Sequence, residues 1–535
     1  MNYFLGTVSV VLLFLLSSCG SSGGSTTTTT TTTTTQPTVS LSVSTSNIFE
    51  QFSRHTQLGT DQNGPDENAQ FGSAVALSED GSRYIASAVN FGNASGLVSV
   101  FDYEDGAWTK VGDDLVSEAA GDQFGISVAI NDSGSTIIIG GRYNDGTANA
   151  AGHAQVYTLV GVTWTQLGSD IDGEALADLF GHSVAISGDA TTVAVGAVEN
   201  DGTASNAGHV RAFRLVDGEW SQIGADIDGE AEADEFGTAV ALSEDGTTLA
   251  VGANFNDGTG VNAGHVRVYS FADGTWTQIG SDIDGEAAGD QFGGSVDLSA
   301  DGTVLAVGAR FNDGSSSPDT GHVRVFERSG STWTQIGSDI NGEAEGDNSG
   351  AEVSLSADGN TVAISAPNND GSASNAGHVR IYTLSNDEWI LASADIDGES
   401  ASDFGGNVSL SADGLRVAVG AANNDDAGTE AGHVRLHERT LLTSSATITA
   451  TIDAASSSNV VATLSEAGTA SGESVDYTLS SSTITITAGQ TTGTATVTSV
   501  PDTTSDDEET IILDIASATA ATVSSNPSTI TIDEL

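Results

Sequence analysis

Carboxylates that recur at a fixed spacing are the residues of this chain best suited to chemistry. Asp282, Asp284 and Glu286 stand at alternate positions around Gly285, and Asp290 follows. Oxygen ligands around a glycine that permits a sharp turn are what a hard cation such as Ca²⁺ requires. The alternative is a solvated acidic turn in which Asp and Gly only suit the backbone. The same spacing adds these candidate metal ligands: Asp170, Asp172, Glu174, Asp178, Asp226, Asp228, Glu230 and Asp234.

Histidines recur as well, each at an equivalent place in a different repeat: His153, His209, His265, His322, His378 and His433. We interpret them as structural, because residues on six different repeats do not converge on one ion unless they line a common axis. The sequence contains no nucleophile elbow, phosphate-binding glycine loop or His-Glu-x-x-His helix. We therefore predict a protein that is not an enzyme, with no catalytic residues and with Ca²⁺ as its candidate cofactor.

The elements that position these residues are set by an internal repeat. Tryptophans recur every 56 or 57 residues, at Trp108, Trp164, Trp220, Trp276, Trp333 and Trp389. Phe-Gly opens most repeats, from Phe71 to Phe404, and Ser349-Gly350 replaces it in the sixth, so the markers count to seven. A fixed period of this length indicates a stacked or ring-shaped repeat fold.

Each repeat contains four short runs with strand alternation, which in the fifth copy are Ser295 to Ser299, Val304 to Ala309, His322 to Phe326 and Trp333 to Gly337. Four strands in each of seven repeats predict an all-β fold, a seven-bladed β-propeller. The array opens with a fourth-strand sequence at 55–59 and ends with a third strand at 433–437. We expect the early strand to complete the last blade, and the tryptophans to pack between blades or, alternatively, to form sugar-binding platforms.

The order Phe-Gly, Val-Gly-Ala and Gly-His-Val resembles the FG-GAP repeats of integrin α-type propellers over about residues 54–440. Those repeats usually carry an Asp-rich calcium loop between their first and second strands. Here the matching turns, such as 243–246 and 299–302, are too short for a cage of six to eight oxygens. The family's calcium ligands are therefore not transferred to these turns.

After residue 440 the composition changes to alternating Thr, Ser, Val and Ile, which is typical of a β-sandwich. The segments 476–477, 484–490, 494–497 and 502–514 resemble a Calx-β domain. Some members of that family bind calcium, and the resemblance implies these candidate ligands: Asp476, Asp502, Asp506, Asp507, Glu508 and Glu509. Residues 443–535 lack the family's first strand, whereas 39–50 has its appearance, so we hypothesise that the propeller is inserted into the sandwich.

The first 19 residues have a short apolar core and end in Leu16-Ser-Ser-Cys19, which resembles the lipobox of bacterial lipoprotein signal peptides. Cys19 is the only cysteine, so lipidation is its expected fate, and Gly20 favours an outer-membrane or cell-surface address. Residues 20–36 are a Gly, Ser and Thr tether. The expected domains are thus 1–19, 20–36, 37–50 as a possible first sandwich strand, 51–440 as the propeller and 441–535 as the sandwich.

The charge restricts the partners. Seventy-three acidic and fourteen basic residues give a net charge of −59, which excludes a nucleic-acid partner, since a phosphate backbone needs basic residues. We expect a lipid-anchored monomer that binds an extracellular protein or glycan through acidic loops on one face, with Ca²⁺ if those loops hold it. A polysaccharide-acting hydrolase or lyase and a passive surface spacer remain as alternatives.

Overall fold

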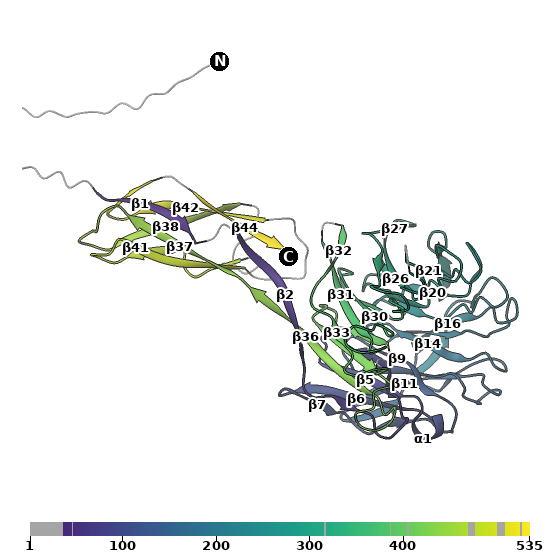
Figure 1. Cartoon of the computed structure of the whole chain (residues 1–535). Coiled ribbons are helices and arrows are strands. Elements are labelled where there is room, and N and C mark those ends of the chain that lie inside the picture. Colours follow the sequence, from purple (N-terminus) through teal and green to yellow (C-terminus); the bar gives the residue numbers. More distant parts are fainter. Residues whose placement is uncertain are drawn as a thin grey trace, which may run out of the picture.

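The structure is a computed structural model that describes residues 36–44, 47–314, 317–385, 387–403, 406–468, 477–499, 509–524 and 527–534. This part of the chain is all-β, apart from the four-residue helix α1 (Phe91–Ala94). None of its helices is long and apolar enough to cross a membrane. Figure 1 shows a ring of small sheets beside an elongated pair of sheets that holds the C-terminal strands.

The repeats fold into small antiparallel sheets with one strand order. Six are separate five-stranded sheets, and the last set lies within a nine-stranded sheet. The first strands are β4 (Phe71–Leu77), β9 (Phe124–Ile130), β14 (Phe180–Ile186), β19 (Val240–Leu242), β24 (Ser295–Leu298), β29 (Val353–Leu355) and β34 (Asn407–Leu410). The second strands are β5 (Arg83–Ala88), β10 (Thr136–Gly141), β15 (Thr192–Ala197), β20 (Thr248–Ala253), β25 (Val304–Ala309), β30 (Thr361–Ala366) and β35 (Arg416–Ala421).

The outer strands complete each sheet. The third strands are β6 (Leu97–Glu104), β11 (His153–Val160), β16 (His209–Val216), β21 (His265–Ala272), β26 (His322–Ser329), β31 (His378–Ser385) and β36 (His433–Thr443). The fourth strands are β7 (Ala107–Lys110), β12 (Thr163–Gln166), β17 (Glu219–Gln222), β22 (Thr275–Gln278), β27 (Thr332–Gln335), β32 (Glu388–Leu391) and β2 (Asn47–Gln57). We number the repeats 1 to 7 by their first strands.

A fifth, two-residue strand was not predicted. These strands are β8 (Leu115–Val116), β13 (Ile171–Asp172), β18 (Ile227–Asp228), β23 (Ile283–Asp284), β28 (Ile340–Asn341), β33 (Ile396–Asp397) and β3 (Gln62–Asn63). Each pairs with the beginning of its third strand, so Ile283 lies opposite Val266 and Asp284 opposite His265. The Asp-Ile-Asp pattern is therefore strand alternation, in which the isoleucine is buried and the carboxylates face outward.

The hairpin between the first and second strands follows from its residues. In repeat 5, Asp301 accepts hydrogen bonds from the Thr303 amide at 2.9 Å and from the Ser299 hydroxyl at 2.9 Å. The Ser299 oxygen in turn accepts the Val304 amide at 2.9 Å. Gly302 has a φ of 66°, a conformation that glycine adopts without strain. These turns are thus satisfied internally, as the short Ser-x-Asp-Gly sequence predicts.

The first strands pack against one another in chain order, and β34 packs against β4. A chain of backbone hydrogen bonds links equivalent turn residues of successive repeats: the amides of Glu244, Ala300, Ala357 and Ala412 donate to the carbonyls of Ala300, Ala357, Ala412 and Glu79 at 2.8 to 2.9 Å. The last of these bonds joins repeat 7 to repeat 1. The sheets therefore surround a common axis, in a propeller-like arrangement.

The tryptophans pack between sheets, as predicted. The Trp164 indole donates to the carbonyl of Val111 in the preceding repeat at 3.0 Å. Equivalent bonds run from Trp108, Trp220, Trp276 and Trp389. The Trp333 nitrogen has no hydrogen-bond partner among the residues that the structure describes. Because Trp108, Trp164 and Trp276 are buried, these three do not offer a free ring face to a sugar.

The early strand completes the last sheet of the ring. Within β2, Gln57 lies opposite His437 and Thr56 opposite Glu438 of β36, a register equivalent to that between β12 and β11. Residues 47–50 at the start of β2 pair with β44 (Ser528–Glu534), and the pairing with β36 begins at Glu50. Both β2 and β36 therefore run from the ring into the elongated pair of sheets, as Figure 1 shows.

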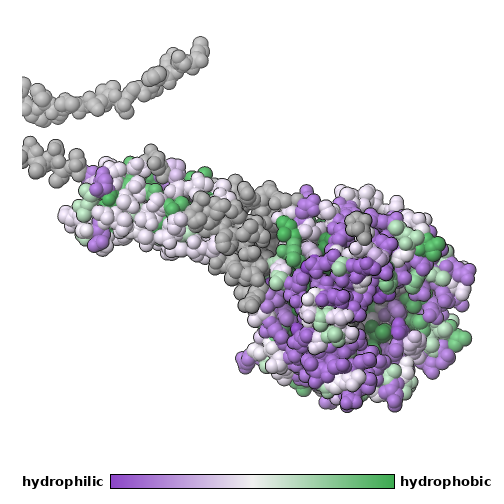
Figure 2. Space-filling view, in the orientation of Figure 1, coloured by the Kyte–Doolittle hydropathy of each residue, from purple (hydrophilic) through white to green (hydrophobic). Residues whose placement is uncertain are grey.

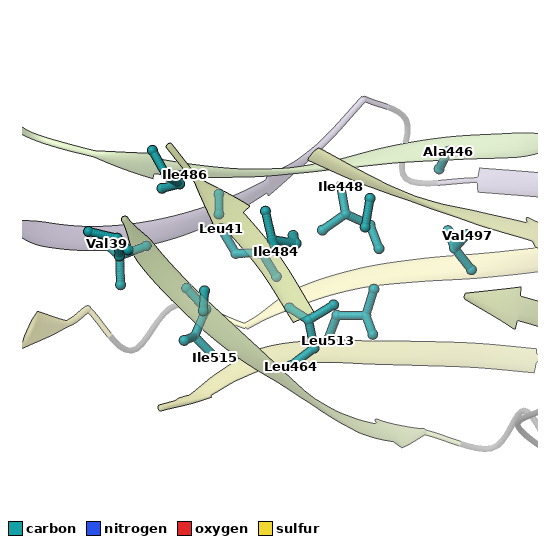
Figure 3. Close-up of a cluster of buried hydrophobic side chains, with 14 of the residues drawn as sticks. Val39, Leu41, Ala446, Ile448, Leu464, Ile484, Ile486, Val497, Leu513 and Ile515 are labelled. Atoms are coloured by element: carbon teal, nitrogen blue, oxygen red, sulfur yellow. The ribbon is translucent and has the colours of Figure 1, made fainter. Parts of the chain in front are cut away.

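The remaining strands form two facing sheets. One has the order β39 (Tyr477–Leu479), β41 (Thr492–Ser499), β37 (Ser445–Ile452), β1 (Thr38–Val43) and β43 (Thr522–Val523). The other continues from β2 and β44 through β42 (Glu509–Ala518) and β38 (Val460–Gly468) to β40 (Thr483–Ile486). Val39 and Leu41 of β1 pack into the shared core with Ile448, Ile484 and other residues (Figure 3).

Candidate cation-binding face

The four carboxylates of one acidic loop do not converge on one point. In the loop of repeat 3, Asp226 accepts the Gln222 amide at 2.7 Å, whereas Asp234 is buried. Asp234 accepts the Ala231 backbone amide at 3.1 Å and the Asn256 side-chain amide at 2.9 Å. It therefore fastens the Asn-Asp-Gly loop that follows the second strand of the next repeat. Strand alternation thus sends Asp226 and Asp234 of this loop to different partners, so these two carboxylates are not placed to share one ion.

The buried fourth carboxylates recur as structural acceptors. Asp178, Asp290 and Asp347 repeat both contacts of Asp234, each with the asparagine found 22 residues later. Asp178 and Asp290 were predicted as metal ligands, and the structure gives them this bracing position instead. Their oxygens are turned into the protein and away from solvent.

The glutamates of the loops face an arginine of the next repeat. Arg211 lies 3.3 Å from Glu174 and also donates to the Asp172 carbonyl at 2.7 Å. Arg267 makes the same contacts with Glu230 and the Asp228 carbonyl. Further pairs join Arg324 to Glu286, Arg380 to Glu343 and Arg435 to Glu399. These ion pairs offset part of the acidic charge where two repeats meet.

At several third-strand histidines, carboxylates gather from one or two of the acidic loops. One ligand atom of each of Glu230, His265 and Asp282 lies within 4.8 Å of the others. We call such sets junction clusters. Further sets include Glu174, His209 and Asp226; Glu286, His322 and Asp339; His153, Asp170 and Asp172; and Asp61, Glu399, Asp426 and His433. The structure thus places predicted metal ligands beside histidines that we interpreted from the sequence as structural.

The histidines of the clusters are uncharged at neutral pH. Burial, reinforced by the Arg211 guanidinium, lowers the pKa of His209 to about 4. The pKa of His322 is lowered to about 4 by burial and by Arg324. A neutral imidazole keeps a lone pair for a metal ion, so the junction clusters combine the nitrogen and oxygen donors that divalent ions use.

A cavity of about 420 Å³ opens at the repeat 5 cluster. His322, Glu286 and Asp339 line it, together with Asn312 and Asp313 of the loop between the second and third strands. The acidic loop and the Asn-Asp-Gly loop therefore share one face, as predicted. Figure 2 shows that the visible side of the ring is mainly hydrophilic.

A second hollow lies on the axis, where first-strand residues enclose about 280 Å³. Asp297 lines it, and its carboxylate accepts the Leu298 and Leu355 amides at 2.8 and 2.7 Å. Burial raises the pKa of Asp297 to about 6, and burial beside Asp297 raises that of Glu352 to about 8. Sequence reasoning missed this pair, although the repeats contain the signal.

That signal is a departure from the repeat. The position of Asp297 is alanine in repeats 1 to 4 and serine in repeats 6 and 7, and that of Glu352 is alanine, serine or asparagine elsewhere. Asp297 and Glu352 each occur in a single repeat, so residues shared by all repeats do not reveal them.

Other predicted residues lie outside the described part of the chain. They are Cys19, Asp476, Asp502, Asp506, Asp507 and Glu508, and for Glu509 only the backbone strand is described. The segments predicted as a signal peptide and, except for Gln36, as a tether also lie there.

Three segments of the chain, 117–157, 170–213 and 225–269, match the FG-GAP repeat. They include the predicted acidic loops at 170–178 and 226–234, but not the one at 282–290, and they agree with the resemblance to FG-GAP repeats. A comparison with curated protein sequences gave no match.

Solved structures with a similar chain trace are distant in sequence. Hydrazine synthase of Kuenenia stuttgartiensis is 15% identical with a TM-score of 0.45, over 72% of this chain and 98% of that chain. The periplasmic gluconolactonase of Pseudomonas aeruginosa is 15% identical with a TM-score of 0.44, over 62% and 86%. A putative 6-phosphogluconolactonase from Bacteroides uniformis is 13% identical with a TM-score of 0.43, over 61% and 83%.

Proposed function

We propose that this chain is a non-enzymatic binding module, attached to the bacterial surface, that holds extracellular ligands through divalent cations on one acidic face. The observation that carries this proposal is the recurrence of junction clusters, in which a neutral histidine meets carboxylates of one or two loops. A cation held there by two or three protein atoms keeps open positions for a carboxylate or hydroxyl of a protein or glycan. Repetition around the ring provides several weak contacts at once, which raises avidity.

The proposed architecture is a seven-bladed propeller inserted into a Calx-β-like sandwich. It is supported by the pairing of β1 with β37 and by the two strands, β2 and β36, that extend from the ring into the sandwich. Lipidation of Cys19 and a tether over 20–36 would then display both parts at the cell surface.

A second candidate is a polysaccharide-acting enzyme, and the neighbouring carboxyl groups of Asp297 and Glu352 favour it. Glu352 has a pKa of about 8 and Asp297 of about 6, and two such groups are the parts of an acid and base pair. Turnover of a polysaccharide by the chain, lost in Glu352→Gln, would favour this candidate over the binding module.

The test is a calorimetric titration of the chelator-treated full chain with CaCl₂ and MnCl₂, followed by binding to a glycan array with and without EDTA. We expect heat from several sites, and array binding that EDTA removes. The double variant Glu230→Gln with Asp282→Asn should lose one site, whereas Glu232→Gln, exposed on the same loop, should lose none. Array binding that is unchanged by EDTA and by the double variant would contradict the proposal.

A further inference from the structure

The junction cluster of repeat 2 differs from the others in its charge. Five repeats carry an arginine two residues after the histidine of the third strand, whereas repeat 2 carries Gln155. The arginines pair with a glutamate of the preceding loop. Near His153 the charges are those of Asp170, Asp122, Asp172 and Glu118, which are all negative. At His153 itself an ion would meet carboxylates, and the nearby Arg211 guanidinium is bound to the Asp172 backbone carbonyl at 2.7 Å.

His153 itself points to a ligand. Its side chain is 3% exposed, and within the described residues no hydrogen bond is made by either ring nitrogen. The Nδ1 atom faces Asp170 Oδ2 at 3.7 Å, which is too long for a hydrogen bond. The ring lies against Gly141, where the equivalent residues of repeats 3 to 7 are alanines. A Cβ atom at Gly141 would lie 2.8 Å from Nε2, so this glycine makes room for the ring.

The carboxylates are already oriented toward this histidine. The Asp170 Oδ1 atom accepts the amides of Gln155 and Gln166 at 3.1 and 2.5 Å, which leaves Oδ2 for another partner. Gln155 is held in turn by the Tyr157 hydroxyl at 2.7 Å. Outer hydrogen bonds of this kind fix the ligands of metal sites. Asp172 lies directly opposite His153 in the register of β13 and β11.

We propose that His153, Asp170 and Asp172 bind one divalent first-row transition ion of the Zn²⁺ type. Their ligand atoms lie within 4.8 Å of one another, close to the separation that bonds of about 2.0–2.2 Å to a shared ion require. Ca²⁺ and Mg²⁺ prefer oxygen donors alone, whereas an imidazole nitrogen selects a transition ion. The Asp170 side chain is 33% exposed, so water has access to complete the coordination. This site deepens the proposed function, because it assigns an ion to one junction cluster.

The test measures ion binding alone, so its outcome is independent of any extracellular ligand. The chelator-treated full chain is titrated with Co²⁺, followed by visible absorbance, and the bound Co²⁺ is then displaced with Zn²⁺. We expect a tight site that Ca²⁺ does not displace. His153→Gln should remove that site, and the matched variant His209→Gln, in a cluster that contains Arg211, should retain it.

Gln155→Arg is a second variant, which we expect to fold normally because five repeats already have arginine at this position. We expect it to weaken Zn²⁺ binding at least about 10-fold, because a guanidinium replaces a neutral amide beside the ion, while the unfolding curve of the chelator-treated chain changes little. Zn²⁺ binding that is equal in the original chain, His153→Gln and Gln155→Arg would overturn the assignment, as would Ca²⁺ that displaces Co²⁺ at equimolar concentration. Failure of glycan binding with this site intact would count only against the proposed function.

Discussion

At the scale of single residues, equal spacing in the sequence conceals unequal roles. Asp226 and Asp234 belong to one acidic loop, yet Asp226 is in a junction cluster and Asp234 is a buried brace. Sequence spacing identified the loop, because carboxylates near glycine are easily recognised. It could not separate the roles, since burial of Asp234 depends on Asn256 in the next repeat.

Asp234→Ala should lower the free energy of unfolding by about 2–4 kcal/mol, because the Ala231 and Asn256 amides then lose a buried acceptor. The measurement is urea denaturation followed by tryptophan fluorescence. Glu232→Ala is the matched control, since Glu232 is exposed on the same loop and should change stability by less than about 0.5 kcal/mol. Equal effects of the two substitutions would exclude a bracing role.

The axial carboxylates make stability depend on pH. Burial beside Asp297 raises the pKa of Glu352 from 4.5 to about 8, so the folded chain keeps a proton that the unfolded chain releases. The stabilisation from this proton is complete below pH 4.5 and is lost as the pH rises through 8. Glu352→Gln should therefore gain stability relative to the original chain from pH 5 to 8, by up to about 1.4 kcal/mol per pH unit.

Denaturation midpoints at several pH values, with Glu232→Gln as the exposed control, measure this difference. The histidines with lowered pKa values destabilise the fold as the pH falls from 6.5 toward 4, but they contribute equally to both chains and cancel. Parallel pH profiles of Glu352→Gln and the original chain would show that Glu352 titrates normally.

At the scale of elements, strands with strong patterns were predictable. The second strand of repeat 5 has the predicted bounds, Val304–Ala309, because a short apolar run between turn residues allows little else. The two-residue strand Ile283–Asp284 was not predicted, since it is too short to show a period and exists only through its pairing with His265 and Val266. Pairing between elements, rather than local preference, decides such strands.

Substitutions of the tryptophans can separate the contribution of packing to stability from that of hydrogen bonding. Trp164→Ala should cost roughly 3–5 kcal/mol of stability, because it removes a buried indole between two sheets. Trp164→Phe keeps most of the packing but leaves the Val111 carbonyl without its 3.0 Å donor, at a cost of about 1–2 kcal/mol. Denaturant midpoints would measure both.

Trp333→Phe is the matched control, because in the described part of the chain the Trp333 nitrogen has no hydrogen-bond partner. It should cost less than Trp164→Phe by about 1 kcal/mol. If the two phenylalanine variants were equally destabilised, the hydrogen bond to Val111 would contribute nothing.

At the scale of the whole molecule, the ends of the ring and the sandwich depend on each other. The residues near 57 and 437 are paired. The two segments that connect the ring to the sandwich, one before the ring in sequence and one after it, therefore lie side by side. The sequence predicted this closure from the order of strand types alone. The pairing of β2 with both β36 and β44 was not predictable, because nothing in Asn47–Gln57 marks where pairing with β44 ends.

The pairing of β1 with β37 offers a direct test of the inserted architecture. Ser42 lies opposite Thr449, and the sequence positions are separated by the whole ring. Directly opposed residues of antiparallel strands are close enough for a disulfide, whereas diagonal ones are about 7–8 Å apart. In a Cys19→Ser background, Ser42→Cys with Thr449→Cys should therefore form a disulfide on mild oxidation, and Ser42→Cys with Thr447→Cys should form far less.

Non-reducing electrophoresis after proteolysis within the ring measures the disulfide, because cleaved fragments stay joined only if it has formed. Equal cross-linking of the two pairs, or none in either, would mean that β1 does not pair with β37 and that the ring is not inserted between sandwich strands.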